Sequence, residues 1–167
     1  EILDFRKAED AGFSHTHIRR VSVSSLLRTQ FEWFYPLSEQ HQIQFKIDAP
    51  KELYWNTDSV YFKKILANLI SNAFKYTEDG GTVRISLHEE ENFLVLKVYN
   101  TGKGIEEADM QNIFDRYRIL GTMDNDDNRQ NTARNGLGLF ICHSLVQSLG
   151  GKIDIESEVG QYAEFTV

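Results

Sequence analysis

Residues 58–100 constrain the fold most, because they join one long helical pattern to two strands of alternating character. The apolar residues of the first part recur at intervals of three and four: Phe62, Leu66, Leu69 and Ala73. This spacing predicts a helix over 58–76 with one buried face. The segments TVRISLHE and NFLVLKVYN that follow are predicted to form an antiparallel pair of strands. The expected nucleus of the fold is therefore a helix packed on a sheet.

The rest of the chain adds further helices and strands to this nucleus. Helices are expected over 24–42, with Ser24 or Ser25 as the N-cap, over 110–114 and over 137–149. Short strands are expected in the segments HIRRVSV, IQFKI, LYWNT, KIDIES and YAEFTV. The sum predicts an α/β (α+β) two-layer sandwich, in which about three helices pack on one face of a mixed sheet.

The composition limits the function classes. The chain has 167 residues, which fits one domain, and its formal net charge of −7 argues against a nucleic acid as the partner. It contains a single cysteine, Cys142, which excludes an internal disulfide and a site of several cysteines. No apolar run approaches the length of a membrane span. We expect a main domain over 15–167, preceded by the end of a longer helix over 1–14.

Three polar residues share one face of the helix predicted over 58–76. Asn68, Asn72 and Lys75 are spaced at i, i+4 and i+7, although asparagine is a poor helix former. One explanation is a solvated polar face. The other is a binding site, because an amide oxygen suits Mg²⁺ and a lysine ammonium can contact phosphate.

Two glycine-rich segments, NTGKGI and NGLGLFI, follow that helix. Neither belongs to a P-loop or to a Rossmann dinucleotide motif. The second is expected to begin the helix over 137–149, where free backbone N–H groups would form an anion site. The polar stretch over 115–135 lacks hydrophobic periodicity, so it is predicted to be a flexible lid over a ligand.

Four segments, in this order and spacing, resemble the catalytic ATP-binding domain of bacterial sensor histidine kinases, which has the Bergerat fold. They are NLISNAFKYT, NTGKGI, IFDRYR and NGLGLFICHSLVQSLGGKI, and the match runs from about Ser22 to the end of the chain. The resemblance implies Mg²⁺ binding by Asn72, and phosphate and ribose contacts by Lys75 and Tyr76. It also implies roles for several further residues: Gly102, Gly104 and Ile105 around adenine, Phe114 and Tyr117 at the start of the lid, and Gly136, Leu137, Gly138 and Leu139 at the triphosphate.

The same resemblance implies the reaction and the partners. Such a domain binds ATP with Mg²⁺ and passes the γ-phosphate to a histidine on a dimerising helical hairpin. The phosphoryl group then moves to an aspartate of a response-regulator receiver domain. Residues 1–14 would be the end of that hairpin, so the chain alone is expected to be a monomer that does not autophosphorylate. The parent protein would be a dimer in the inner membrane, with this domain in the cytoplasm.

Two residues bear on the chemistry. Asn68 stands where the hydrolysing members of the superfamily carry a glutamate base, and an amide cannot take a proton from water. Slow hydrolysis and transfer to a partner nucleophile are therefore expected, with catalysis by positioning and charge neutralisation. Arg116 lies beside the aromatic residues of the predicted lid and is either a phosphate ligand or an exposed arginine.

Three residues depart from the family pattern. Asn100 stands where an adenine-binding aspartate is usual, and its amide can accept a hydrogen bond or, when flipped, donate one. We therefore expect relaxed base discrimination. Glu164 either supplies the missing acceptor to the nucleotide or is a solvent-facing glutamate. Arg134 replaces a glycine and either adds charge near the phosphates or is a solvated residue of the lid.

Two other functions remain open. One is a degenerate module that serves for docking and binds nucleotide weakly or not at all. Asn100 and Arg134 favour it. The other is an ATPase of the chaperone or topoisomerase kind, which Asn68 and the short chain disfavour.

Overall fold

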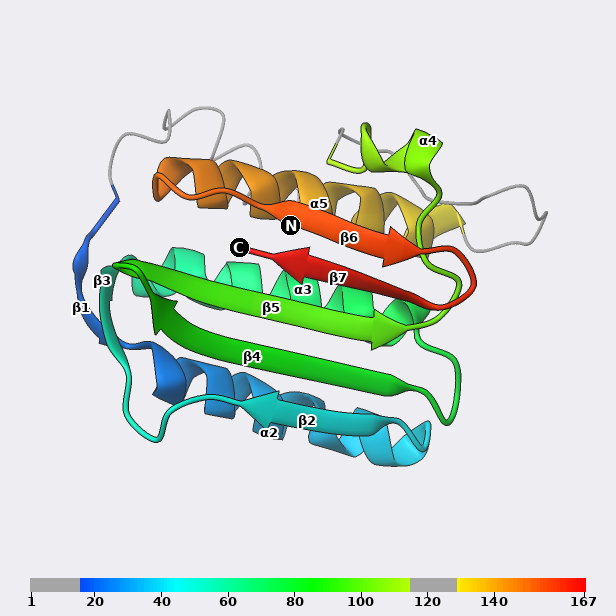
Figure 1. The fold of residues 1–167 in the computed structure, drawn as a ribbon, viewed down its shortest axis with the longest axis horizontal. Helices are drawn as coiled ribbons and strands as arrows, with labels where there is room; N and C mark the ends of the chain where they lie inside the picture. The colour runs from blue at the N-terminus through cyan, green and yellow to red at the C-terminus, as the bar shows by residue number, and fades with distance from the viewer. Residues whose placement is uncertain (1–15, 115–128) are drawn as a thin grey trace.

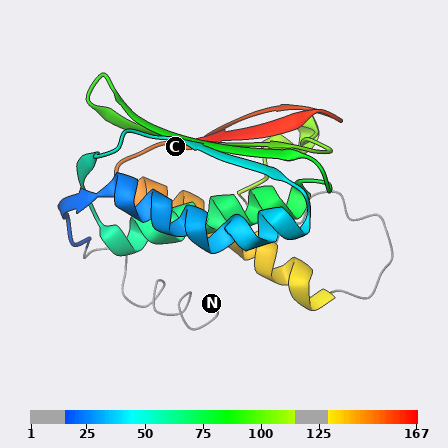
Figure 2. The same ribbon diagram turned by 90° about the horizontal axis from the view of Figure 1, so that it is seen from below.

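The computed structural model describes residues 16–114 and 129–167, and for 129–137 it describes the backbone alone. The sheet and the helices form two layers (Figures 1 and 2). The elements in chain order are β1 (Arg19–Ser22), α2 (Val23–Gln40), β2 (Gln44–Asp48), β3 (Tyr54–Thr57), α3 (Ser59–Tyr76), β4 (Thr82–Glu90), β5 (Phe93–Thr101), α4 (Glu107–Met110), α5 (Arg129–Ser148), β6 (Asp154–Glu158) and β7 (Tyr162–Thr166).

The main sheet has the strand order β2-β4-β5-β7-β6. β2 runs parallel to β4, and the other neighbouring strands are antiparallel, so the sheet is mixed. The predicted pairing of β4 with β5 is confirmed, with Ile85 opposite Val98 and Leu87 opposite Leu96. β1 and β3 form a separate antiparallel pair beside this sheet.

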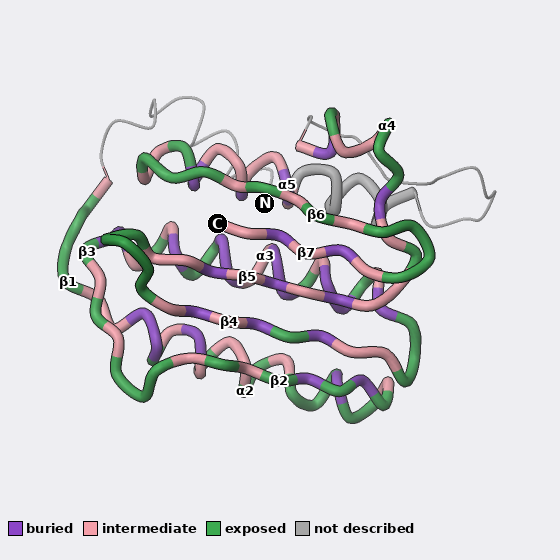
Figure 3. Tube along the Cα trace, in the orientation of Figure 1, coloured by how far each residue is buried: buried purple, intermediate pink, exposed green. Residues whose placement is uncertain are grey.

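The hydrophobic core lies between the sheet and the helices α2, α3 and α5, which cover one face of the sheet (Figure 2). In β4 the side chains of Val83, Ile85 and Leu87 are at most 1% exposed, whereas Arg84 between them is exposed. This alternation places one face against the helices and leaves the other open (Figure 3). The predicted two-layer sandwich is therefore confirmed.

Helix α3 begins where Asp58 caps it. The Asp58 carboxylate accepts hydrogen bonds from the backbone N–H groups of Val60 and Tyr61, at 2.9 and 3.1 Å, and from His17 at 2.9 Å. Burial alone would raise the pKa of this carboxyl, but these hydrogen bonds outweigh it and lower the pKa. The cap thus fixes the start of the helix that carries the polar face.

Two predicted helix boundaries are wrong. α2 begins at Val23, after Ser22, so neither Ser24 nor Ser25 is its cap. The hydroxyl of Ser24 instead accepts a hydrogen bond from Leu53 N at 2.9 Å, which joins the helix to the segment before β3. The short helix predicted over 110–114 lies earlier, at α4.

The start of α5 is also different from the prediction. The helix begins at Arg129, so the glycines 136 and 138 lie within it and do not open it. Backbone N–H groups inside a helix bond to the carbonyl four residues earlier, so the predicted anion site of free amides is absent from the described backbone here. The last part of the predicted lid, 129–135, is helical, while 115–128 lies outside the described residues.

Candidate functional site

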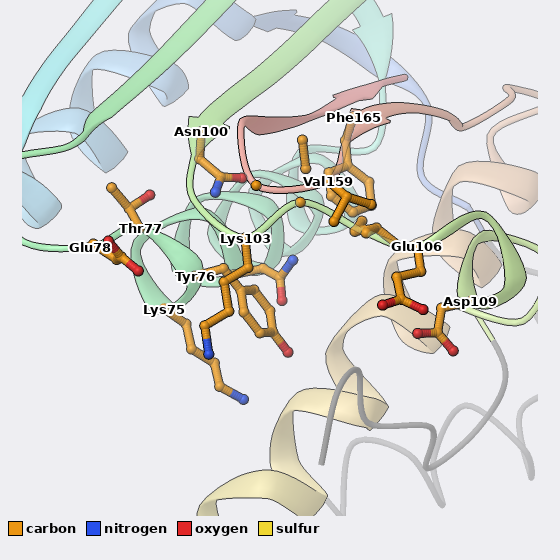
Figure 4. A pocket seen from close by; sticks show the side chains of 15 residues that line it. Lys75, Tyr76, Thr77, Glu78, Asn100, Lys103, Glu106, Asp109, Val159 and Phe165 are labelled. Atoms are coloured by element: carbon orange, nitrogen blue, oxygen red, sulfur yellow. The ribbon is translucent and has the colours of Figure 1, made fainter. Parts of the chain in front are cut away.

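A cavity of about 570 Å³ opens where β5 and α3 end, beside the turn between β6 and β7 (Figure 4). Predicted site residues from two distant segments line it: Asn72, Lys75, Tyr76, Asn100, Gly104 and Ile105. Ile105 is 6% exposed and belongs to the hydrophobic core, so it joins the cavity to the packed interior. The structure therefore brings the polar face of α3 and the NTGKGI loop to one place.

Both glycines of that loop are required by close backbone approach. A Cβ on Gly102 would collide with the carbonyl oxygen of Tyr76, and a Cβ on Gly104 would collide with that of Glu158. Gly104 also has φ +68°, a conformation that side-chain-bearing residues rarely adopt. The loop consequently lies tight between the end of α3 and the β6–β7 hairpin.

Hydrogen bonds attach the loop to that hairpin. Ser157 Oγ accepts from Ile105 N and donates to Tyr162 O, each at 2.7 Å. Gly160 N donates to Lys103 O at 2.7 Å, in the turn of the hairpin. Sequence reasoning missed Ser157. The available signal was a hydroxyl at an inward position of the strand KIDIES, two residues after Ile155.

Asn100 lies at the end of β5 and is 4% exposed. Its Nδ2 donates to the Thr101 carbonyl oxygen at 3.1 Å. If the amide were flipped, Asn100 Oδ1 and the Thr101 carbonyl oxygen, which are both acceptors, would face each other at that distance. This hydrogen bond therefore determines the orientation of the Asn100 amide. Oδ1 has no hydrogen-bond partner among the described residues, and no fully buried side-chain oxygen or nitrogen there lacks one. The Asn100 oxygen therefore faces the cavity as an acceptor (Figure 4).

Lys75 and Tyr76 contribute the last turn of α3 to the cavity. The Lys75 ammonium lies 5.1 Å from the ring centroid of Tyr76, within the range of a cation–π interaction. Burial lowers the pKa of Lys75 and raises the pKa of Tyr76, since both charged forms lose hydration. Lys75 is nevertheless exposed, so its ammonium can contact an anion at the mouth of the cavity.

Asn68 lies one turn before Asn72 and faces α5. Its Oδ1 would be 3.6 Å from a Cβ on Gly138, so these two predicted residues are neighbours. Leu139 is 6% exposed and packs in the core. Arg116 and Tyr117 lie outside the described residues. For Arg134, Gly136 and Leu137 only the backbone is described.

The structure places Glu164 outside the cavity lining, as the solvent-facing alternative predicts. Glu164 pairs with Tyr99 and Glu156, while Asn100 pairs with Ala163. Successive side chains of a strand point to opposite faces, so Glu164 lies on the open face and Ala163 lines the cavity. The sheet therefore lies between the Glu164 side chain and the cavity.

Comparison with known proteins identifies the family. Residues 57–167 match the model of the histidine kinase-, DNA gyrase B-, and HSP90-like ATPases. The chain belongs to this family. Among curated relatives, the circadian input-output histidine kinase CikA of Synechococcus elongatus is 33% identical over the whole chain and 22% of its own length. The sensor protein SrrB of Staphylococcus aureus is 35% identical over 70% of the chain and 19% of its own length.

Solved structures of histidine kinases share the fold. Full-length ShkA in complex with AMPPNP has a TM-score of 0.80 at 24% identity, covering 99% of this chain and 33% of that protein. The catalytic domain of ThkA has a TM-score of 0.72 at 23% identity, covering 90% of this chain and 95% of that domain. These matches confirm the resemblance and the fold. The chain spans about a fifth of the length of the curated relatives.

Proposed function

We propose that this domain binds Mg-ATP in the cavity and donates the γ-phosphate to a histidine on a dimerising hairpin of its parent protein. The receiver domain of a response regulator would then take the phosphoryl group. The observation that carries this proposal is the cavity itself, which Asn72, Lys75, Asn100 and Ile105 line together in a relative of sensor histidine kinases.

The two halves of the cavity fit the two halves of the nucleotide. The Asn100 oxygen and the apolar side chain of Ile105 suit a flat base that carries a donor group. The ammonium of Lys75 suits phosphate oxygens, and the amide oxygen of Asn72 suits Mg²⁺. When bound, Mg²⁺ would supply charge neutralisation at the phosphates.

Asn68 favours transfer over hydrolysis. It lies one helical turn from Asn72, and its amide cannot act as the base that activates water. The role of the domain is then to hold the nucleotide and neutralise its charge while a partner histidine supplies the nucleophile. Arg116 is proposed as a further cation in this step, and Tyr117, Gly136 and Leu137 as further contacts to the nucleotide.

The remaining assignments concern the parent protein. We assign residues 1–14 to the end of the phosphoacceptor hairpin and 15–167 to the catalytic domain, on the cytoplasmic side of an inner-membrane dimer. Among the described residues, no helix has both the length and the apolar character that a membrane span needs. ThkA has been crystallised in complex with the response regulator TrrA, which supports a receiver domain as the partner of this domain.

Calorimetry of the chain with Mg-ATP tests the nucleotide step. We expect saturable binding that Asn72→Ala weakens and that the change of its exposed neighbour, Ser71→Ala, leaves unaltered. Labelled ATP, incubated with the parent protein including its hairpin, should yield an acid-labile phosphohistidine. No binding at millimolar ATP would instead indicate a docking module, and rapid hydrolysis without phosphohistidine would indicate an ATPase.

A further inference from the structure

Lys103 lies in the NTGKGI loop, whose backbone is held by hydrogen bonds and close contacts. It lies between Gly102 and Gly104, and its carbonyl oxygen accepts the hydrogen bond from Gly160 N. Gly102 N donates to Gln161 O at 3.1 Å. These backbone contacts fix where the Lys103 side chain starts, and this side chain lines the cavity.

The side chain of Lys103 extends to the same side of the cavity as Lys75. Figure 4 shows both ammonium groups beside the ring of Tyr76, although one comes from the loop after β5 and the other from the end of α3. Three acidic side chains also line the cavity: Glu106 and Asp109 lie on its other side, whereas Glu78 lies on the side of Lys75 (Figure 4). The side with Glu106 and Asp109 is thus acidic, while the side of Lys75 and Lys103 carries two ammonium groups and one carboxylate.

A purely structural role for Lys103 finds no support in its contacts. Among the described residues, Lys103 takes part neither in the ion pair of His41 with Asp79 nor in that of His88 with Glu90. Two ammonium groups beside one ring repel each other weakly, and an anion bound between them would remove that repulsion. The pair is therefore better suited to a ligand than to the free protein.

We propose that Lys103 is a second phosphate-binding cation, which acts with Lys75 to hold the polyphosphate of the nucleotide. This inference rests on the proposed function, since it assumes that the base lies beside Asn100. It makes Lys103 a determinant of the preference for a nucleotide over a nucleoside, because the uncharged nucleoside gains nothing from the second ammonium.

The test compares ATP and adenosine binding by calorimetry for the wild type, Lys103→Gln and Lys103→Arg. Lys103→Gln should weaken ATP binding about fivefold, the upper end for an exposed ion pair, and leave adenosine binding unchanged. Lys103→Arg should retain the affinity for ATP. The dependence of ATP binding on salt should also be shallower in Lys103→Gln, because one screened charge pair is lost. Lys152→Gln is the control, since this exposed lysine follows the C-terminal end of α5 and does not line the cavity.

Each outcome separates the two proposals. A wild type that binds neither ATP nor adenosine overturns the proposed function and the role of Lys103 together. A wild type that binds ATP, with an unchanged affinity in Lys103→Gln, overturns the role of Lys103 alone. An equal loss of affinity for ATP and for adenosine in Lys103→Gln would also overturn this role, since it would indicate that the substitution distorts the NTGKGI loop.

Discussion

A comparison of ATP with inosine triphosphate, in which a carbonyl replaces the 6-amino group of the base, tests the orientation of the Asn100 amide. With Nδ2 held by the Thr101 carbonyl, Oδ1 can accept a hydrogen bond from the amine of adenine but meets another acceptor in inosine triphosphate. A neutral hydrogen bond contributes about 0.5–1.5 kcal/mol, and an acceptor buried without a donor costs about 1–3 kcal/mol. Together they give about 1.5–4.5 kcal/mol, or roughly 10- to 2,000-fold tighter binding of ATP.

This expectation differs from the one that the sequence gives, in which a freely flipping amide relaxes base discrimination. Asn100→Leu keeps the approximate size of the side chain but removes the acceptor, so its preference for ATP should fall to about threefold or less, because both the hydrogen bond to adenine and the unpaired acceptor opposite inosine are lost. Asn100→Asp keeps an acceptor and should retain the preference. Because an amide does not titrate, the wild-type preference should be equal at pH 6 and pH 8.

The assay is calorimetric titration of each variant with ATP and with inosine triphosphate. Equal affinities of the wild type for the two nucleotides would refute the fixed orientation. A preference for ATP that persists in Asn100→Leu would show that backbone groups or other side chains select the base.

Three further predictions concern the structure that supports the cavity. Ser157→Ala removes the acceptor of Ile105 N, so it should lower the free energy of unfolding by about 1–3 kcal/mol and weaken ATP binding, as measured by urea unfolding and calorimetry. Gly104→Ala introduces a collision with the Glu158 carbonyl oxygen at a residue with positive φ. It should therefore reduce the affinity for ATP more than Ser157→Ala does. Asp58→Ala removes the cap of α3 and should cost about 0.5–2 kcal/mol. The pKa of Asp58 is lowered in the folded state, so its contribution to stability is complete above the ordinary pKa of an aspartate and is lost as the pH falls through the lowered pKa. The wild type should therefore lose more stability on acidification than Asp58→Ala does. Thermal unfolding of both proteins from pH 7 to pH 3 measures this difference.

The local patterns were sufficient for the elements that depend on near neighbours in the chain. The three- and four-residue spacing on α3 placed its buried face correctly, because an α-helix repeats every 3.6 residues. The alternation on β4 and β5 predicted their pairing, because a short connection joins antiparallel strands. These patterns also brought Asn72 and Lys75 to one face before any tertiary contact was considered.

By itself, then, the sequence determined the two-layer fold, the family and six of the residues that line the cavity. The tertiary structure alone decided which face Glu164 occupies, since that depends on the register of β7 against β5. It also decided the orientation of the Asn100 amide and the bond from Ile105 to Ser157, 52 residues further along the chain. A strand's periodicity gives the alternation of its side chains, but only its neighbours determine which set faces the core, and a hydrogen bond between distant segments exists only once the sheet has formed.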